Sequence, residues 1–120
     1  MQKTVYLIDK DPAVIDVIAL MLADEGYRTV IASKPFDLSE LLGAGPALII
    51  LHNGLDGKGI TICRKIKHEL QTRNIPVIMS STNANLSSIS QTAGADAFIR
   101  KPFDLDEFCA LIKDTLSRHQ

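Results

Sequence analysis

The stretch "TVYLIDKDPAVIDVIALMLADEG", residues 4–26, decides the fold because it joins a predicted strand to a predicted helix. Its first five residues are rich in strand formers, and from Pro12 the apolar residues recur at helical spacing in one broad stripe that includes Val17. Asp11 has the position of a helix N-cap before a proline, and Gly26 stands where a left-handed C-cap is expected. The segment therefore predicts a β-strand followed by an amphipathic α-helix.

The same alternation of strand and helix recurs four more times along the chain. The predicted strands cover residues 28–33, 47–51, 76–80 and 97–99, and the predicted helices cover 36–42, 60–70, 86–93 and 105–116. Because the strands are short apolar runs without period-2 alternation, both faces of the sheet should be covered by helices, which favours a parallel sheet. We therefore predict one α/β domain over residues 1–120, with a doubly wound, flavodoxin-like sheet of five parallel strands in the order 2-1-3-4-5.

Composition and charge exclude several classes of function. The 13 basic and 14 acidic residues are spread along the chain, so we expect no direct contact with nucleic acid. The apolar runs are too short to cross a membrane and no export signal is evident, so we expect a cytoplasmic protein without a membrane partner. Cys63 and Cys109 lie in apolar segments without metal-binding spacing, which predicts reduced core residues rather than a zinc site.

Polar residues follow the predicted strands at the points where the strands end. In a doubly wound sheet the functional crevice lies at the carboxyl ends of the strands, so these side chains should meet in one small site. The residues are Asp9, Lys10 and Asp11 after the first strand, His52 after the third, Ser81 after the fourth and Lys101 after the fifth.

Several motifs give the chain a resemblance to the receiver domain of bacterial response regulators, the CheY-like domains of two-component and phosphorelay systems. "GADAFIRKPF" at residues 94–103 is the most specific motif, because it resembles the family's signature around an invariant lysine. "YLIDKDP" (6–12), "PALIIL" (46–51), "CRKIK" (63–67) and "IPVIMSS" (75–81) resemble the first strand, third strand, third helix and fourth strand of the family. The resemblance covers the whole chain.

The resemblance implies a phosphorylation chemistry whose residues are only partly present. In the family an aspartate at the end of the third strand attacks a phosphoryl group held by Mg²⁺, which two acids after the first strand help to bind. At the matching positions Asp9 keeps the first acid, Lys10 replaces the second, and His52 replaces the phosphate-accepting aspartate. Lys101 matches the invariant lysine.

The resemblance also implies two switch positions, Ser81 and Phe98, through which phosphorylation rearranges the surface of the fourth helix, fifth strand and fifth helix. The segment between Ser81 and Lys101 has 19 residues, about two fewer than is common in the family, so we expect the fourth helix to be the element most open to movement or displacement. Both switch positions are kept although the acceptor is lost.

A charge count of the predicted site argues against a metal. Asp9 carries one negative charge, Lys10 and Lys101 carry two positive charges, and His52 is close to neutral at pH 7, so the sum is +1, or zero if Asp11 also faces the site. Mg²⁺ prefers carboxylate and carbonyl oxygen, so we expect no metal and no cofactor. We expect Asp9 to pair with Lys10, Lys101 or both.

These observations predict a degenerate pseudo-receiver that is not an enzyme. It would act through protein partners in bacterial signalling, bound at the surface of the fourth helix, fifth strand and fifth helix, and a homodimer stays possible. One alternative is a receiver phosphorylated atypically, on His52 or with Asp11 as a displaced metal ligand. A remote alternative is a haloacid-dehalogenase-type phosphatase, since "LIDKDPA" (7–13) fits the D-x-D loop with Asp9 as nucleophile and Asp11 as acid and base.

Overall fold

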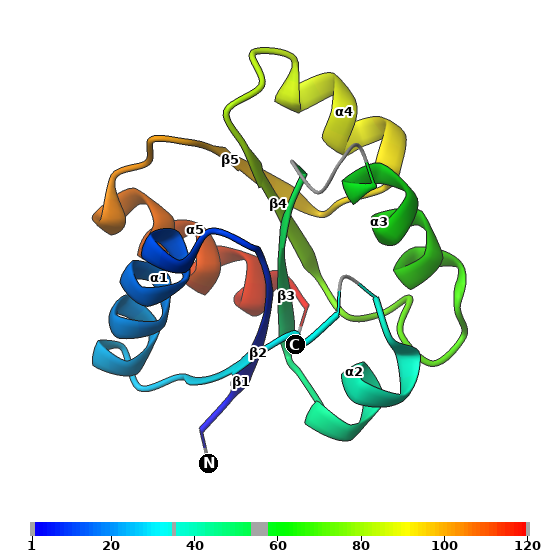
Figure 1. Ribbon diagram of the computed structural model, residues 1–120, viewed down its shortest axis with the longest axis horizontal. Coiled ribbons are helices and arrows are strands. Elements are labelled where there is room, and N and C mark those ends of the chain that lie inside the picture. Colours follow the sequence, from blue (N-terminus) through cyan, green and yellow to red (C-terminus); the bar gives the residue numbers. More distant parts are fainter. Residues whose placement is uncertain (1, 35, 54–57, 120) are drawn as a thin grey trace.

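A computed structural model describes residues 2–34, 36–53 and 58–119 of the chain. Five strands alternate with five helices along the described residues (Figure 1). The elements are β1 (Thr4–Ile8), α1 (Pro12–Asp24), β2 (Arg28–Ile31), α2 (Leu38–Ala44), β3 (Leu48–His52), α3 (Gly59–His68), β4 (Val77–Ser81), α4 (Leu86–Ala93), β5 (Ala97–Arg100) and α5 (Leu105–Arg118).

The five strands form a single parallel sheet in the order β2-β1-β3-β4-β5, which confirms the predicted topology. β1 pairs with β2 and β3, and β4 continues the sheet from β3 to β5. Because all five strands are parallel, their carboxyl ends lie along one edge of the sheet, where the predicted site residues are found.

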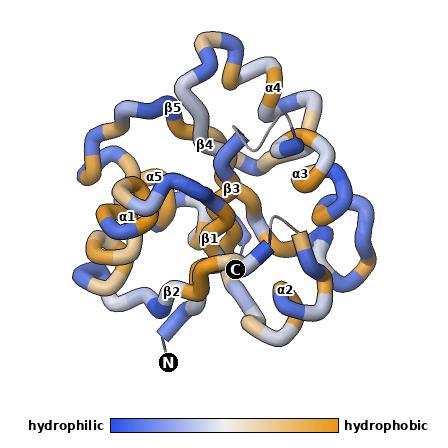
Figure 2. The backbone as a smooth tube through the Cα atoms, viewed as in Figure 1, coloured by the Kyte–Doolittle hydropathy of each residue, from blue (hydrophilic) through white to orange (hydrophobic). Residues whose placement is uncertain are grey.

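Helices cover both faces of the sheet, so the core is divided into two apolar layers. One layer contains Leu22 and Phe108 and lies between the sheet and helices α1 and α5. The other contains Tyr6 and Ile66 and lies beneath α2, α3 and α4. The apolar colour of the central strands in Figure 2 follows from this double coverage, which explains why the strands lack period-2 alternation.

The predicted limits of the first helix are confirmed by its capping interactions. The Asp11 carboxylate accepts a hydrogen bond of 3.0 Å from the backbone N–H of Ala13, and Pro12 is the first helical residue. Gly26 takes the left-handed conformation, with φ of 85°, directly after the C-cap residue Glu25.

The second predicted helix begins later than its apolar pattern indicated. Residue 36 was the expected start, but α2 begins at Leu38 because Asp37 is the N-cap, with its carboxylate accepting a 2.9 Å hydrogen bond from the N–H of Glu40. The preceding strand ends at Ile31 rather than at residue 33. The Glu40 carboxylate accepts hydrogen bonds from both the backbone N–H and the hydroxyl of Ser33, which turns the chain away from the sheet.

The two cysteines differ in their surroundings. Cys63 is fully buried, as predicted, and burial raises the pKa of its thiol to about 11. Cys109 is only half-buried at the edge of the α1–α5 layer, so the prediction of a core residue is wrong in part for this position. Among the described residues, none of the helices combines the length and the apolar character needed to span a bilayer.

Candidate functional site

The strand ends bring the predicted site residues to the same edge of the sheet. Asp9 directly follows β1 and Lys101 directly follows β5, while His52 and Ser81 are the last residues of β3 and β4. The order of the strands places β1 beside β3 and β4 beside β5. Residues far apart in the sequence therefore meet here because of the topology alone.

A buried ion pair forms the centre of the site. The Lys101 ammonium donates a 2.9 Å hydrogen bond to Oδ2 of Asp9, and the side chains of Asp9 and Lys101 are only 1% and 11% exposed. The expected pairing of Asp9 with Lys101 is thus confirmed. Because both charges are largely removed from water, separating them is far more costly than separating a surface pair.

His52 is the third member of the cluster. Its Nδ1 lies 3.2 Å from the Lys101 ammonium. An ammonium can only donate, so Nδ1 of His52 accepts and the ring proton of the neutral imidazole is on Nε2. Burial and the adjacent Lys101 charge lower the pKa of His52, and the opposing effect of Asp9 does not overcome them. The neutral imidazole is therefore the form that fits this site.

The other oxygen of the Asp9 carboxylate is held by the backbone. Oδ1 accepts hydrogen bonds from the N–H groups of Lys10, at 2.7 Å, and Asp11, at 3.1 Å. Burial by itself raises the pKa of Asp9, but the backbone hydrogen bond from Asp11 and the Lys101 ammonium together lower it below its usual value. Asp9 is therefore a carboxylate with donors on both oxygens.

Lys10 and Asp11 lie at the rim of the cluster rather than inside it. The Lys10 side chain is exposed, yet its charge contributes to lowering the pKa of His52. Asp11 is also exposed, and one of its carboxylate oxygens is committed to the α1 N-cap described above. The prediction that Asp11 is a helix cap is confirmed.

The two switch positions differ in exposure. Ser81 is 5% exposed, and its hydroxyl oxygen accepts a 3.1 Å hydrogen bond from the N–H of Asn83. Phe98 is 41% exposed on β5. Near them, the Arg100 guanidinium donates to the carbonyl of Ala84 at 3.1 Å, so β5 is tied to the loop that precedes α4.

A groove beside the ion pair was not predicted from the sequence. It has a volume of about 490 Å³, and Asp11 and Lys101 line it together with Thr82, Pro102 and Phe103. Phe103 ends the "GADAFIRKPF" motif, and its ring packs edge-on against that of Phe108 with centroids 4.7 Å apart. The motif was a usable signal for Phe103, but no sequence pattern marks Thr82 as a neighbour of Lys101.

The donor set does not match the requirements of Mg²⁺. A magnesium site needs several oxygen ligands, whereas the cluster offers one carboxylate with both oxygens hydrogen-bonded, one ammonium and one imidazole nitrogen. Within residues 2–34, 36–53 and 58–119, no three His, Cys, Asp or Glu side chains are grouped as a metal site requires. Residues 54–57, which include Asp56, lie outside the described residues.

The chain is similar in sequence to the receiver domain family and to curated transcriptional regulators. The model of the response regulator receiver domain family matches residues 5–113. The DNA-binding dual master transcriptional regulator RpaA of Synechocystis is 32% identical over 95% of this chain and 49% of its own length. The phosphate regulon transcriptional regulatory protein PhoB of Pseudomonas aeruginosa is 31% identical over 97% of this chain and 52% of its own length. The chain thus spans about half the length of these curated relatives.

Solved structures with similar folds match nearly the entire chain. A CheY-like response regulator receiver domain protein from Methanospirillum hungatei has a TM-score of 0.87 at 28% identity, covering 99% of this chain and 97% of its own. A putative response regulator from Chloroflexus aurantiacus has a TM-score of 0.89 at 25% identity, covering 98% of this chain and 99% of its own.

Proposed function

Because this chain belongs to the response regulator receiver domain family, we propose that it is a two-component signalling module that acts through protein contacts without the family's Mg²⁺-dependent aspartyl phosphorylation. The observation that carries the proposal is the buried Lys101–Asp9 ion pair with His52 against it. In this pseudo-receiver the Asp9 carboxylate, which would otherwise attract a metal cation, is already paired with the Lys101 ammonium. The site is neutralised from within the protein.

The energetics of the ion pair support a site closed to divalent cations. To bind a metal, Asp9 would have to give up the Lys101 ammonium, which would then remain nearly buried without a carboxylate partner. Lys10 stands where the family has a second acid, so it removes an oxygen ligand and adds a positive charge near the site. No described side chain compensates for either loss.

Phosphorylation of His52 has less support than a site that is not phosphorylated. The Nδ1 lone pair of His52 already accepts from Lys101, and Nε2 carries the ring proton, so neither nitrogen presents an available lone pair in this arrangement. A phosphatase using Asp9 and Asp11 is likewise unsupported. Asp9 is bound to an ammonium rather than positioned as a free nucleophile, and Asp11 caps α1. We therefore propose that the domain is not an enzyme.

The surface of α4, β5 and α5 is the partner site that we propose from the family resemblance. Phe98 exposes 41% of its surface there, which offers an aromatic contact to a partner. The Arg100 hydrogen bond to Ala84 ties the loop before α4 to β5 and so contributes to a defined surface. Contact through this surface requires no phosphoryl group.

Restoring the missing acids tests the proposal. We expect His52→Asp alone to give little or no phosphorylation from acetyl phosphate, because Lys10 still opposes Mg²⁺ binding. His52→Asp with Lys10→Asp should recover Mg²⁺-dependent incorporation, measured by mass spectrometry of the intact protein. His52→Asp with Lys3→Asp is the matched charge control, since Lys3 lies at the opposite edge of the sheet.

Two outcomes would contradict the proposal. Equal labelling of the single and double variants would show that Lys10 has no influence on the site. Stoichiometric labelling of His52 in the unmodified chain would show that the domain is a phosphorylated receiver of an unusual kind.

A further inference from the structure

Basic residues are concentrated on α3 and on the turn that follows it. Residues 58–73 contain five Lys or Arg residues and a single acidic residue, Glu69, although the formal net charge of the whole chain is −1. α3 covers the face of the sheet opposite α1 and α5 (Figure 1), and the proposed function uses none of the residues 58–73. We call the exposed cations of this segment the basic face of α3; they are Lys58, Arg64, Lys65 and Arg73.

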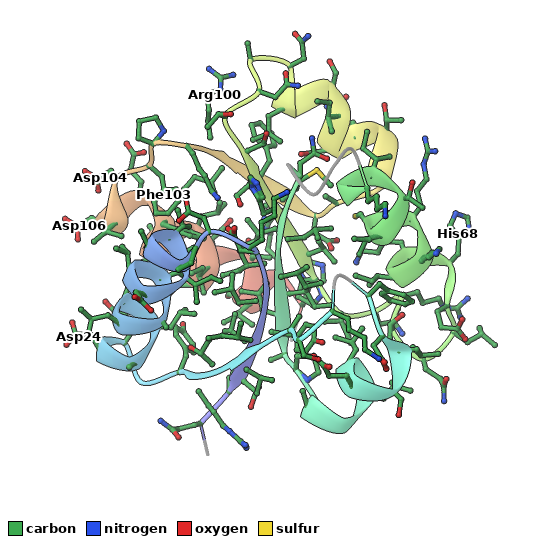
Figure 3. All side chains as sticks on the ribbon, viewed as in Figure 1. Asp24, His68, Arg100, Phe103, Asp104 and Asp106 are labelled. Atoms are coloured by element: carbon green, nitrogen blue, oxygen red, sulfur yellow. The ribbon has the colours of Figure 1, made fainter. Side chains whose placement is uncertain are left out.

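α3 has one buried side and one charged side. Ile62 and Ile66 are buried in the core layer beneath α2, α3 and α4. Arg64, Lys65 and His68 are exposed, and they share the opposite side of the helix because residues three and four apart are neighbours on a helix surface. Figure 3 shows the labelled His68 on the outer side of α3, away from the sheet. The cations of α3 are therefore presented to solvent together.

The basic face of α3 has no acidic partner within the part of the chain that the structure describes. Several other cations of the domain are paired with an Asp or Glu, namely Lys34, Lys67, Lys101, Lys113 and Arg118. No described carboxylate forms an ion pair with a cation of the basic face. Lys65 lies over the Phe36 ring, 5.9 Å from its centroid, a contact that orients the ammonium without neutralising it. The positive charge of this face is therefore available to a partner.

The helix dipole explains only part of this positive charge. Lys65 and His68 lie in the last turn of α3, where the negative end of the dipole favours cations. Lys58 is the N-cap, where the dipole disfavours a cation, and its side chain makes no capping hydrogen bond. Arg64 precedes the last turn, and Arg73 lies beyond the helix. The stability of α3 therefore does not account for Lys58, Arg64 or Arg73.

An exposed leucine lies at the end of the basic face. Leu70 is 72% exposed and follows His68 by two residues. The N–H of Arg73 donates a 2.8 Å hydrogen bond to the carbonyl of Glu69, so residues 69–73 form a helix-like turn that holds Leu70 beside the cations. A few cations next to one apolar residue are typical of protein interfaces, whereas nucleic-acid sites depend on a larger number of phosphate contacts. The combination favours a protein partner.

We propose that the basic face of α3 is the docking site for an acidic helical segment of a partner protein. Glu or Asp residues three and four apart on that segment lie opposite Arg64 and Lys65, and an apolar residue of the segment covers Leu70. A helix fits because its side chains at that spacing are about 5–6 Å apart, which is the repeat of the cations on α3. Acidic charge fits because it complements the basic face and excludes partners of the wrong charge.

A second copy of this chain is a poorer occupant. Its most acidic segment is residues 11–25, which contain four acidic residues and no Lys or Arg. Two of those four carboxylates are already engaged, because Asp11 caps α1 and Glu25 pairs with Lys113 at 3.2 Å. A contact between two basic faces would in turn bring like charges together. Charge complementarity thus selects a separate acidic partner over self-association.

The test uses a fluorescein-labelled helical peptide of about 18 residues, with glutamates three and four apart on one side and a leucine near one end. Binding is measured by fluorescence anisotropy and mapped by amide chemical shifts. We expect saturable shifts at residues 58–73, and we expect binding to weaken as NaCl is added because the contact is exposed and electrostatic. A peptide in which lysine replaces every glutamate should cause no shifts at residues 58–73.

The charge contribution is tested with two double variants of equal charge change. Arg64→Gln with Lys65→Gln removes two adjacent cations of the basic face and should weaken binding of the glutamate peptide by about tenfold. Arg28→Gln with Arg118→Gln removes two exposed cations from β2 and α5, outside the basic face, and should leave binding unchanged.

The apolar contribution is tested with a matched pair of leucines. Leu70→Gln should weaken binding of the glutamate peptide by about fivefold, as the loss of an apolar interface contact commonly does. Leu20→Gln should leave binding unchanged, because Leu20 is 74% exposed but lies on α1, across the sheet from α3. Both variants should keep the native circular dichroism and thermal midpoint, since neither side chain is buried.

Four results would overturn the proposal. The first is a glutamate peptide that shows no saturable binding or shifts amides only outside residues 58–73. The second is equal loss of binding in the two double variants. The third is tighter binding of a DNA duplex of about 20 base pairs at the same amides, because the occupant would then be a nucleic acid. The fourth is a dimer of the unmodified chain, seen by analytical ultracentrifugation, that Arg64→Gln with Lys65→Gln dissolves, because the occupant would then be a second copy.

Discussion

Removing the negative charge of Asp9 should destabilise this domain. In Asp9→Asn the shape of the side chain is kept, but the Lys101 ammonium loses its carboxylate while its side chain remains only 11% exposed. Breaking a buried pair by removing one partner typically costs 3–5 kcal/mol, and the remaining exposure of Lys101 places the expected loss near the lower limit, at about 3 kcal/mol. Urea denaturation followed by circular dichroism gives this free energy of unfolding directly.

A double-mutant cycle separates the ion pair from local packing. Lys101→Met in the Asp9→Asn background removes the unpaired charge and should recover most of the lost stability, with a coupling energy of at least about 1.5 kcal/mol. Asp16→Asn at an exposed position of α1 is the control and should change stability by less than about 0.5 kcal/mol. If Asp9→Asn instead stabilised the domain, the negative charge of Asp9 would be destabilising in the absence of a metal cation. Our interpretation of the site would then be wrong.

Two further predictions concern pH. The pKa of His52 is lowered below 6.5 in the folded state, so the unfolded chain binds more protons just below that value and stability should fall as pH drops from about 7 to about 5. His52→Gln should flatten that part of the urea-derived profile, and an unchanged slope would contradict a neutral His52. The pKa of Glu40 is lowered from 4.5 to about 2, first by its hydrogen bond from the Ser33 hydroxyl and then by that from Tyr6. Its contribution to stability should be complete above about pH 4.5 and be lost toward pH 2, a dependence that Glu40→Gln should remove and that thermal melts between those values would detect.

The fold could be predicted because it rests on local patterns. Buried parallel strands and capped amphipathic helices each leave a signal within a few residues, as Asp11 and Gly26 do for α1. The early end of β2 and the late start of α2 were missed. The start of α2 is set by the Asp37 N-cap, a local signal that the apolar pattern did not include, whereas β2 ends where Ser33 contacts Glu40, seven residues away.

The sequence could predict which residues belong to the site, but not the contacts that they make with one another. Strand ends placed Asp9, His52, Ser81 and Lys101 together, but the assignment of the His52 acceptor nitrogen depends on the three-dimensional position of Lys101. The exposure of Val17 was also missed. Helical spacing placed it in the broad apolar stripe of α1, whereas Val17 is 46% exposed in the structure.

The most direct test of a site closed to metal is a Mg²⁺ titration of the unmodified chain, followed by the amide chemical shifts of Ser81 and Lys101. A parallel titration with NaCl at matched ionic strength corrects for screening. We predict that Mg²⁺, alone or with beryllofluoride, causes no saturable shift at these amides beyond the NaCl control, because the Asp9 carboxylate is already paired with the Lys101 ammonium. Saturable shifts at Ser81 and Lys101 that disappear in Asp9→Asn would show that Asp9 binds the metal, and would contradict the account.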